Sequence, residues 1–277
     1  MSICFLNDKY IDIRDAKISP LDRGFLFGDA IYEVIIAFNK KPFELEAHVS
    51  RLKKNISTLG YSFEDTLDIE AIIQEVIARN TFLNQVIYLQ ISRGTDAIRD
   101  HIPGNNLSPT IFVSSHELQT DFSLSSGEKA ILVEDFRWRK SQIKATSLLA
   151  NVIYRSEAKQ KQVFETILFE NGFITEGAVS NVFCCINNKI ITPPISENIL
   201  PGVTRKVVLE LIQDASLECM ETKIPVDSFL QAEEIWVTNS TKGIIPIIEL
   251  DGKKIGSGLP GKKYTQISKA FLEKLSG

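Results

Sequence analysis

Lys144 is the residue whose type and setting most directly suggest chemistry. It follows an apolar run at 130–133, which predicts a buried strand, and precedes apolar positions within 148–153 that have the spacing of an amphipathic helix. A lysine between two such elements has a rigid support and a side chain that can swing, and an amine that forms a Schiff base needs both. Most lysines are solvated surface charges instead, so the interpretation depends on the rest of the chain.

The segment 200–204, Leu-Pro-Gly-Val-Thr, is typical of an anion site. Its glycine lets the backbone approach a ligand closely, and the amides of Val203 and Thr204 would lie at a helix start, where the dipole favours a phosphate. An ordinary helix start, with proline in the first turn and threonine as a cap, explains the same residues equally well. Ser240 and Thr241 add a second pair of hydroxyl groups in a loop after a predicted strand.

Four further side chains have both an ordinary and a chemical interpretation. Glu176 stands at a predicted strand end, where a glutamate is usually a turn residue. Beside a pyridine ring, its carboxylate would keep the ring nitrogen protonated and make the ring an electron sink. Arg51, on a predicted helix, is either solvated or a phosphate ligand. Arg99 and His101 place two donors in one polar loop, which is either plain surface or a site for a substrate carboxylate.

The composition excludes several classes of function. The chain has 277 residues, 44% of them hydrophobic, and a net charge of −4 without a basic block, so nucleic acid is not a predicted partner. No run approaches the roughly 20 apolar residues of a membrane helix, and the first residues lack a signal-peptide pattern. Four scattered cysteines and three separated histidines favour free thiols in a reducing cytoplasm and predict no metal site.

Strands and helices mix along the chain without strict alternation, which indicates an α+β architecture in two domains. We predict a small N-terminal domain at 1–117, a polar linker at 118–128 and a larger C-terminal domain at 129–277 that contains Lys144. The segment 19–29 is predicted to be a loop. The predicted strands include 30–38, 85–92, 110–114, 165–170, 180–186 and 233–238, and the predicted helices are 45–59, 67–78, 146–162, 200–215 and 262–275.

Six motifs together resemble the class IV aminotransferases, the fold-type IV enzymes that use pyridoxal 5′-phosphate. The resemblance covers nearly the whole chain and is strongest to the branch that acts on D-amino acids. The motifs lie at 22–33 (DRGFLFGDAIYE), 46–52 (EAHVSRL), 143–151 (IKATSLLAN), 175–183 (TEGAVSNVF), 200–205 (LPGVTR) and 237–241 (VTNST).

The resemblance assigns roles to residues at the matching positions. It implies that Lys144 forms the Schiff base with the cofactor and that Glu176 pairs with the pyridine nitrogen. It implies a substrate site at Tyr32, Arg99 and His101, the last two forming a carboxylate trap that reaches in from a partner subunit. The cofactor-binding residues that it implies are Arg51, Lys144, Glu176, Ser180, Leu200, Gly202, Val203, Thr204, Ser240 and Thr241.

The implied activity is transamination between a D-amino acid of the D-alanine type and a 2-oxo acid, by a homodimer with a pseudo-barrel sheet in its larger domain. Two alternatives share the fold and the lysine: 4-amino-4-deoxychorismate lyase and a branched-chain aminotransferase. The lyase is expected to have a threonine hydroxyl near the cofactor after Asp29, where this chain offers only Tyr32. Ala178 and Val179 replace serines that are common in the D-amino-acid enzymes, and the loop of Arg99 is shifted by about one residue.

Overall fold

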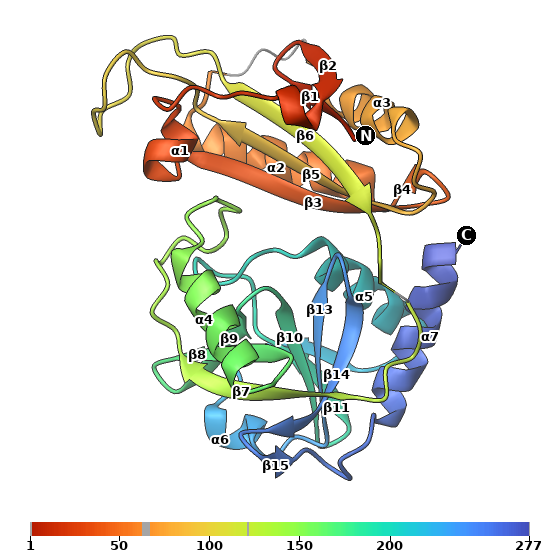
Figure 1. The fold of residues 1–277 in the computed structure, drawn as a ribbon. Coiled ribbons are helices and arrows are strands. Elements are labelled where there is room, and N and C mark those ends of the chain that lie inside the picture. Colours follow the sequence, from red (N-terminus) through yellow and green to blue (C-terminus); the bar gives the residue numbers. More distant parts are fainter. Residues whose placement is uncertain (1, 63–66, 121, 277) are drawn as a thin grey trace. The chain divides into compact units, whose positions relative to one another are not determined.

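The computed structural model describes residues 2–62, 67–120 and 122–276 of the chain (Figure 1). Its contacts divide the chain into two compact units. Unit 1 consists of residues 1–119 and 143–147, and unit 2 of residues 120–142 and 148–277. The short segment 143–147 therefore belongs to unit 1. This differs from the predicted domain division, which placed all of 129–277, and Lys144 with it, in a C-terminal domain.

Unit 1 contains an antiparallel six-stranded sheet with the order β2-β1-β6-β5-β3-β4 (Figure 1). The long central strands β3 and β5 pair residue by residue, with Tyr32 opposite Gln90 and Val34 opposite Tyr88. The strands of this sheet are β1 (Ile3–Leu6), β2 (Lys9–Asp12), β3 (Ala30–Phe38), β4 (Lys41–Pro42), β5 (Gln85–Ser92) and β6 (Thr110–Glu117).

One face of this sheet packs against helices α2 (Leu45–Leu59) and α3 (Ile69–Arg79). Ile31 and Ile35 of β3 share this core with Leu52 of α2, and all three are fully buried. Burial of such a side chain contributes roughly 1.5–3 kcal/mol to folding. Because side chains alternate along a strand, Tyr32 lies on the opposite face of the sheet from these residues.

A short helix, α1 (Arg23–Phe27), replaces the loop predicted at 19–29. The Asp22 carboxylate accepts a hydrogen bond from the amide of Gly24 and so caps the helix at its start. Gly28 ends it in the left-handed conformation, at φ 65°, where a side chain would meet the Ser147 hydroxyl. Five residues are too few to produce a helical period of apolar residues, so the sequence pattern does not reveal α1.

Residues 143–147 form no regular element, but Ala145 makes an isolated antiparallel bridge with Ile31 of β3. The Tyr32 amide donates to the carbonyl of Lys144 at 3.0 Å, and the Thr146 amide donates to the carbonyl of Ala30 at 2.9 Å. These hydrogen bonds keep the segment out of the next helix. Helix α4 therefore begins at Leu149 and not at the predicted residue 146.

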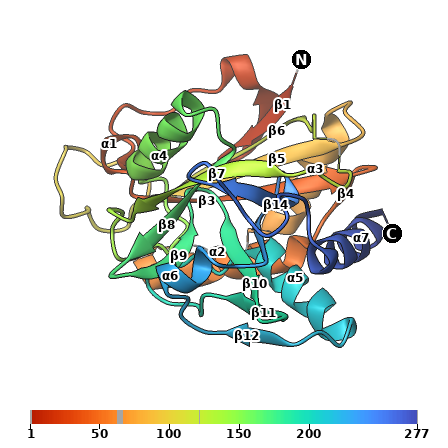
Figure 2. The ribbon, with the colours of Figure 1, turned by 90° about the horizontal axis from the view of Figure 1, so that it is seen from below.

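Unit 2 is built on a nine-stranded mixed sheet with the order β12-β11-β10-β13-β14-β7-β8-β9, and β15 pairs with β14. The sheet curls into a half-barrel (Figure 2). Its strands are β7 (Glu128–Glu134), β8 (Glu165–Glu170), β9 (Phe173–Gly177), β10 (Asn181–Ile186), β11 (Lys189–Thr192), β12 (Cys219–Glu221), β13 (Glu234–Asn239), β14 (Gly243–Leu250) and β15 (Lys253–Lys254).

The helices of unit 2 are α4 (Leu149–Gln160), α5 (Val203–Asp214), α6 (Val226–Phe229) and α7 (Lys262–Ser276). The core includes Val182, Val237 and Phe229, which join strands β10 and β13 to α6. Helix α6 and strand β12 are too short to have been predicted from periodicity. Among the helices of the described residues, none has both the length and the apolarity needed to cross a membrane.

Candidate active site

In unit 1, the amine of Lys144 lies over an aromatic ring. Its Nζ atom is 4.2 Å from the centroid of Tyr32, and the lysine is only partly buried. The two backbones are also joined by the hydrogen bond from the Tyr32 amide to the Lys144 carbonyl. The lysine is therefore held at its backbone by β3, and not by the strand and helix between which the sequence predicted it; its role as a reactive amine stays a prediction.

The sheet face that carries Tyr32 is aromatic and polar. The rings of Tyr32 and Tyr88 lie 5.9 Å apart, and the Tyr88 hydroxyl donates to the side-chain oxygen of Gln90 at 2.7 Å. Burial, followed by the nearby Tyr32, raises the pKa of Tyr88 to about 12, so this phenol stays protonated. Sequence reasoning missed Tyr88 and Gln90. The alternation of β5 predicted their shared face but not which strand they would adjoin.

Arg51, a predicted phosphate ligand, lies in a buried ion pair on the α2 side of the sheet. Its Nε and Nη2 donate to the two carboxylate oxygens of Glu33 at 2.8 and 2.6 Å, and Nδ1 of His48 lies 2.7 Å from the same carboxylate. Burial by itself would raise the pKa of Glu33, but the charge and hydrogen bonds of Arg51, with His48, lower it to about 2. Burial lowers the pKa of His48, and the charge of Lys144 adds to this shift.

The predicted carboxylate-binding residues lie in the loop between β5 and β6. Arg99 and His101 are both exposed, and both approach Phe27 of α1. The Arg99 guanidinium carbon is 4.9 Å from the centroid of the Phe27 ring, and the His101 ring centroid is 5.3 Å from it. Unit 1 therefore brings the two predicted residues together on one aromatic side chain.

In unit 2, Glu176 is a buried carboxylate at the end of β9. Its Oε1 accepts from Nη1 of Arg137 at 2.6 Å, and its Oε2 accepts from Nδ2 of Asn181 at 3.1 Å and from the amide of Leu200 at 2.9 Å. Asp135 holds the other side of Arg137, with Nη2 at 2.7 Å from Oδ2. Burial raises the pKa of Glu176 to about 7, although the positive charge of Arg137 opposes this shift.

Helix α5 begins beside this carboxylate. Gly202 precedes the helix without a side-chain cap, and a Cβ atom there would lie 2.0 Å from Oδ1 of Asn181, so any other residue would displace the Asn181 side chain. The first amides of the helix, those of Val203 and Thr204, have no partner within the helix and can bind an anion. Both residues are buried.

A buried hydroxyl without a partner lies on the neighbouring strand. Thr238 of β13 is directly opposite Asn181 of β10, which places both side chains on one face of the sheet. Among the described residues, its Oγ1 has no hydrogen-bond partner. The predicted pair Ser240 and Thr241 follows in the turn after β13, both partly buried, with the Thr241 hydroxyl 3.3 Å from Oδ1 of Asn239. Thr238 lies within the motif at 237–241, but the sequence analysis gave a role only to Ser240 and Thr241 of that motif.

Ser180, a predicted cofactor-binding residue, forms a hydrogen bond with Glu165. Its hydroxyl donates to Oε2 of Glu165 at 2.8 Å, and Glu165 is fully buried. Burial raises the pKa of Glu165, and Ser180 counteracts part of that shift. The role of Ser180 at a cofactor therefore stays a prediction, and the structure gives its hydroxyl a different partner.

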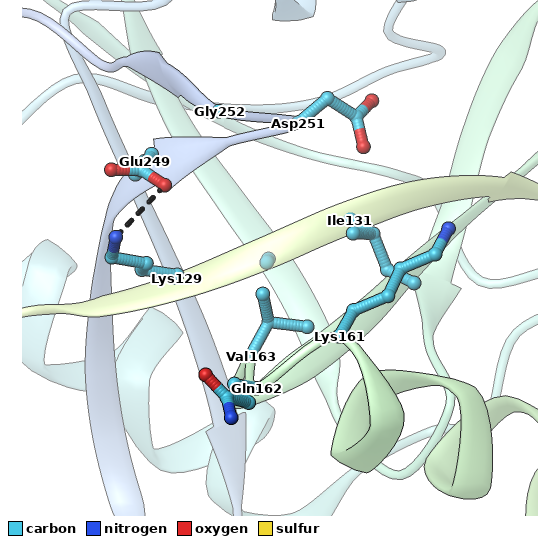
Figure 3. Close-up of a pocket in the computed structure, with 9 residues that line it drawn as sticks. Lys129, Ile131, Lys161, Gln162, Val163, Glu249, Asp251 and Gly252 are labelled. Carbon is cyan, nitrogen blue, oxygen red and sulfur yellow. Dashed lines mark ion pairs between the residues drawn. The ribbon is translucent and has the colours of Figure 1, made fainter.

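A separate pocket of about 650 Å³ opens on unit 2, and none of the predicted site residues lines it (Figure 3). Lys129 and Glu249 form an ion pair of 3.1 Å at its edge. The lining residues are Lys129, Ala130, Ile131, Lys161, Gln162, Val163, Glu249, Asp251 and Gly252. Within the described part of the chain, no group of three or more histidine, cysteine, aspartate or glutamate side chains could hold a metal ion.

The chain belongs to the class IV aminotransferases. The sequence model described as "Amino-transferase class IV" matches residues 30–250, which include the lysine, the glutamate and the start of α5. The protein is therefore a pyridoxal-phosphate-dependent aminotransferase with the fold of the type IV enzymes.

Two relatives are similar over nearly the whole chain. A D-alanine aminotransferase of Bacillus licheniformis is 34% identical over 274 residues, which are 98% of this chain and 96% of the relative. A D-alanine aminotransferase of Staphylococcus haemolyticus is 33% identical over 277 residues, with 98% and 97% covered.

Solved structures share the fold at lower identity. The branched-chain amino acid aminotransferase of Escherichia coli superimposes with a TM-score of 0.89 at 22% identity and covers 98% of this chain and 94% of its own. The branched-chain aminotransferase of the archaeon Thermoproteus uzoniensis, crystallised with norvaline, gives a TM-score of 0.87 at 22% identity, with 99% and 95% covered. At this identity the likeness concerns the fold alone.

The residues present fit pyridoxal phosphate. In unit 2, the amides at the start of α5, which has no side-chain cap, can donate to a phosphate, and so can the Thr238 hydroxyl, which has no partner among the described residues. A carboxyl group whose pKa lies near neutrality, that of Glu176, suits proton sharing with a pyridine nitrogen. In unit 1, partly buried Lys144 supplies a primary amine.

Proposed function

We propose that this aminotransferase moves an amino group between a D-amino acid of the D-alanine type and a 2-oxo acid. The observation that carries the proposal is the amine of Lys144, held over Tyr32 on a backbone fixed to β3. The choice of substrate is supported by the relatives, which are D-alanine aminotransferases at 30–34% identity over nearly their whole length.

Lys144 is the residue that we propose to hold the cofactor covalently and to move the proton. Pyridoxal phosphate, when bound, supplies an aldehyde that takes up an amino group and a ring that delocalises the electrons of the substrate α-carbon. The neutral Nζ of Lys144 accepts the α-proton and later returns a proton, so one amine serves as anchor and base. Tyr32 limits the positions that this amine samples, because its ring covers one side of Nζ.

Glu176 is proposed to control the protonation of the cofactor ring. Its carboxylate is fixed by Arg137, Asn181 and the Leu200 amide, so it can change its protonation without changing its position. The Glu176 carboxyl group has a pKa of about 7 and is paired with the charged guanidinium of Arg137. It can face a protonated nitrogen as an anion, and burial keeps water from screening that contact.

The phosphate and the substrate carboxylate require different donors. We propose that the amides of Val203 and Thr204 and the hydroxyls of Ser240 and Thr241 bind the phosphate. Arg51 also belongs to the predicted phosphate set, whereas Leu200 and Gly202 of the helix start belong to the wider set of predicted cofactor-binding residues. The bidentate ion pair between Arg51 and Glu33 fixes the orientation of the Arg51 guanidinium. Arg99 and His101 are proposed to receive the substrate carboxylate, because both side chains are exposed donors on one loop.

The absorbance spectrum of the purified enzyme with pyridoxal phosphate tests this function. D-alanine, L-leucine and aminodeoxychorismate are added in separate experiments. Loss of the long-wavelength cofactor band with D-alanine alone, accompanied by pyruvate, is expected. A response to L-leucine instead would identify a branched-chain aminotransferase. Release of 4-aminobenzoate from aminodeoxychorismate, without a response to either amino acid, would identify the lyase.

Assembly and location are part of the proposal. We propose a homodimer in the cytoplasm. The family resemblance supports the dimer, and the four free cysteines support a reducing compartment. Light scattering of the eluting protein should give twice the chain mass of 31.1 kDa. A monomer of full activity would contradict the dimer, and recovery of the native protein outside the cytoplasmic fraction would contradict the location.

A further inference from the structure

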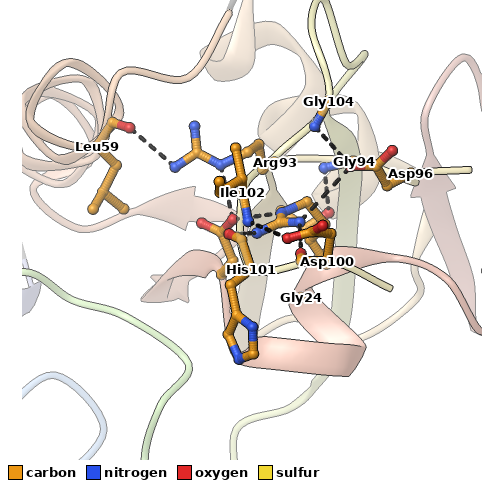
Figure 4. A network of polar contacts seen from close by, with 12 residues as sticks. Gly24, Leu59, Arg93, Gly94, Asp96, Asp100, His101, Ile102 and Gly104 are labelled. Carbon is orange, nitrogen blue, oxygen red and sulfur yellow. Dashed lines mark hydrogen bonds and ion pairs between the residues drawn. The ribbon is translucent and has the colours of Figure 1, made fainter. Parts of the chain in front are cut away.

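We propose that Arg23 and Phe27 of helix α1 act as positioning residues that clamp the loop 95–104 and so aim Arg99 and His101 at the substrate carboxylate. This inference rests on the proposed function, which gives Arg99 and His101 their role. The clamp itself lies wholly within unit 1. Figure 4 shows the polar network around the loop residues Asp96, Asp100 and His101.

The guanidinium of Arg23 binds the loop through its backbone. Nη1 donates to the carbonyl of Asp100 at 2.7 Å, and Nη2 donates to the carbonyl of His101 at 2.9 Å. Nε donates to Asp29 at 3.0 Å, so the same side chain is anchored at its base. Arg23 is only 3% exposed. A buried guanidinium that holds two successive carbonyls fixes the direction of the peptide bond between them, next to both predicted carboxylate ligands.

Helix α1 is itself a rigid support for this contact. The Asp22 carboxylate accepts from the amide of Gly24 at 2.8 Å and from the hydroxyl of Ser92 at 2.8 Å. The Arg23 amide donates to the carbonyl of Gly94 at 2.9 Å. The helix is therefore attached to the end of β5, and Arg23 fixes the loop relative to the sheet.

The loop is closed by its own hydrogen bonds. Asp96 accepts from the amides of Ala97 and Gly104, each at 2.8 Å, and its Oδ2 lies 3.8 Å from Nη1 of Arg23. The loop buries little apolar surface of its own: residues 98–102 are all exposed, and Ile98 and Ile102 remain 67% and 79% accessible. The polar contacts with Arg23 of α1 therefore restrain its conformation together with the loop's own hydrogen bonds.

Phe27 orders the side chains that the loop presents. The guanidinium carbons of Arg23 and Arg99 lie 4.8 and 4.9 Å from the centroid of the Phe27 ring. The centroid of the His101 ring lies 5.3 Å from the same point. Cation–π contact restricts the long Arg99 side chain while it leaves the donors of the guanidinium accessible to a carboxylate.

Preorganisation of this kind lowers the entropy lost when the carboxylate binds. Ordering a long side chain at a binding site has a cost comparable to a several-fold change in affinity, and the loop backbone adds to it. The clamp should therefore affect binding of the substrate carboxylate more than the chemical step. We expect its loss to raise KM for the amino acid and for the oxo acid about tenfold, with kcat within about twofold.

The test compares Arg23→Gln with Arg93→Gln in the holoenzyme, with D-alanine and 2-oxoglutarate as substrates. Arg93 is a matched control because it pairs with the same carboxylate, Asp29, at 2.7 Å, but its Nη atoms donate to the carbonyls of Leu59 and Gly60 and not to the loop. Arg23→Gln should raise both KM values about tenfold and Arg93→Gln by less than about twofold. Hydrogen exchange across 95–104 should accelerate only in Arg23→Gln.

Two more variants keep the proposal testable if Arg23→Gln unfolds. Arg23→Lys retains the charge beside Asp29, but one ammonium group cannot span two carbonyls in the same geometry, so it should show the raised KM as well. Phe27→Leu keeps an apolar residue at the end of α1 and removes the ring, and it should raise KM without a loss of cofactor content.

The clamp is overturned if Arg23→Lys and Phe27→Leu leave KM unchanged, or if Arg93→Gln raises it equally. Arg99→Gln separates this outcome from failure of the proposed site. If KM is raised in Arg99→Gln but in none of the clamp variants, the clamp is rejected and the carboxylate-binding role of Arg99 is retained. If KM is unchanged in Arg99→Gln as well, both proposals are rejected. If the enzyme acts on L-leucine and not on D-alanine, the D-amino-acid proposal fails, and the same series with L-leucine still decides the clamp.

Discussion

The substitution Arg137→Met should destabilise unit 2 strongly. Arg137 lies between two buried carboxylates, 2.7 Å from Asp135 and 2.6 Å from Glu176, and the three side chains are only 5–6% exposed. Burial by itself would raise the pKa of Asp135, but hydrogen bonds and the charge of Arg137 lower it. Methionine has a similar length but no charge, so it would leave two buried acids without their common partner.

Removal of one partner from a buried ion pair costs about 3–5 kcal/mol, because the remaining charge stays desolvated. For a chain of this size, each kcal/mol corresponds to about 2–4 °C in Tm. We therefore expect Tm of the cofactor-free protein, followed by circular dichroism, to fall by roughly 6–20 °C. Arg139→Met is the control: Arg139 is 74% exposed in its pair with Glu170, and such pairs contribute about 0–1 kcal/mol.

The pH dependence provides a second check. The pKa of Asp135 is lowered on folding, so its stabilising contribution is present above its ordinary pKa of 3.8 and is lost as pH falls. The pKa of Glu176 is raised from 4.5 to about 7, so its contribution is present below 4.5 and is lost as pH rises through about 7. Without Arg137 both carboxyls favour the neutral form. The difference in Tm between wild type and variant should therefore widen from about pH 4 to about pH 8. A drop no larger than that of Arg139→Met, or a difference that narrows with rising pH, would refute this reasoning.

Three further predictions concern individual residues. Lys144→Ala should abolish transamination, and Lys140→Ala, at an exposed neighbour, should leave kcat within about twofold; near-normal turnover in the first variant contradicts the proposed role. Glu33→Gln should make the fall in Tm at acid pH less steep. The pKa of Glu33 is lowered from 4.5 to about 2, so its contribution to stability is lost over that interval as pH falls. An equally steep fall in Tm below pH 4.5 in the variant would contradict this. Ser180→Ala should lower Tm, because buried Glu165 loses a hydrogen bond, a loss of about 1–3 kcal/mol, while cofactor affinity stays within about twofold. Weaker cofactor binding at constant Tm would assign the hydroxyl to the cofactor instead.

Regular elements were predictable wherever a local period repeats several times. The strand at 30–38 and the helix at 45–59 were predicted with the bounds that the structure shows. Alternation in a strand and the 3.6-residue period of a helix are properties of adjacent residues, so they can be read from the chain. The motifs around Lys144, Glu176 and the start of α5 likewise indicated the class IV aminotransferases, and the family match confirms this.

Contacts between distant residues had no such local signal. Glu33 and Arg51 were both visible in the sequence, but their bidentate pairing depends on how α2 packs on β3. Arg137 lay close to the predicted lysine, yet its contact with Glu176, 39 residues further along the chain, depends on the pairing of β7, β8 and β9 in one sheet. The resemblance named Ser180 as a cofactor-binding residue, which stays a prediction, whereas the hydrogen bond from its hydroxyl to Glu165 had no local signal in the sequence.

The sequence by itself determined the class of enzyme, the lysine expected to define its chemistry and most of the regular elements, because each depends on residues that are near one another in the chain. Tertiary structure decided the setting of those residues: the return of 143–147 to unit 1, the buried ion pairs of Arg51 and Arg137, and the contacts of α1 with the loop of Arg99. Each of these depends on burial and on hydrogen bonds between distant segments. These contacts contribute to stability only after folding has excluded water from around the groups that form them.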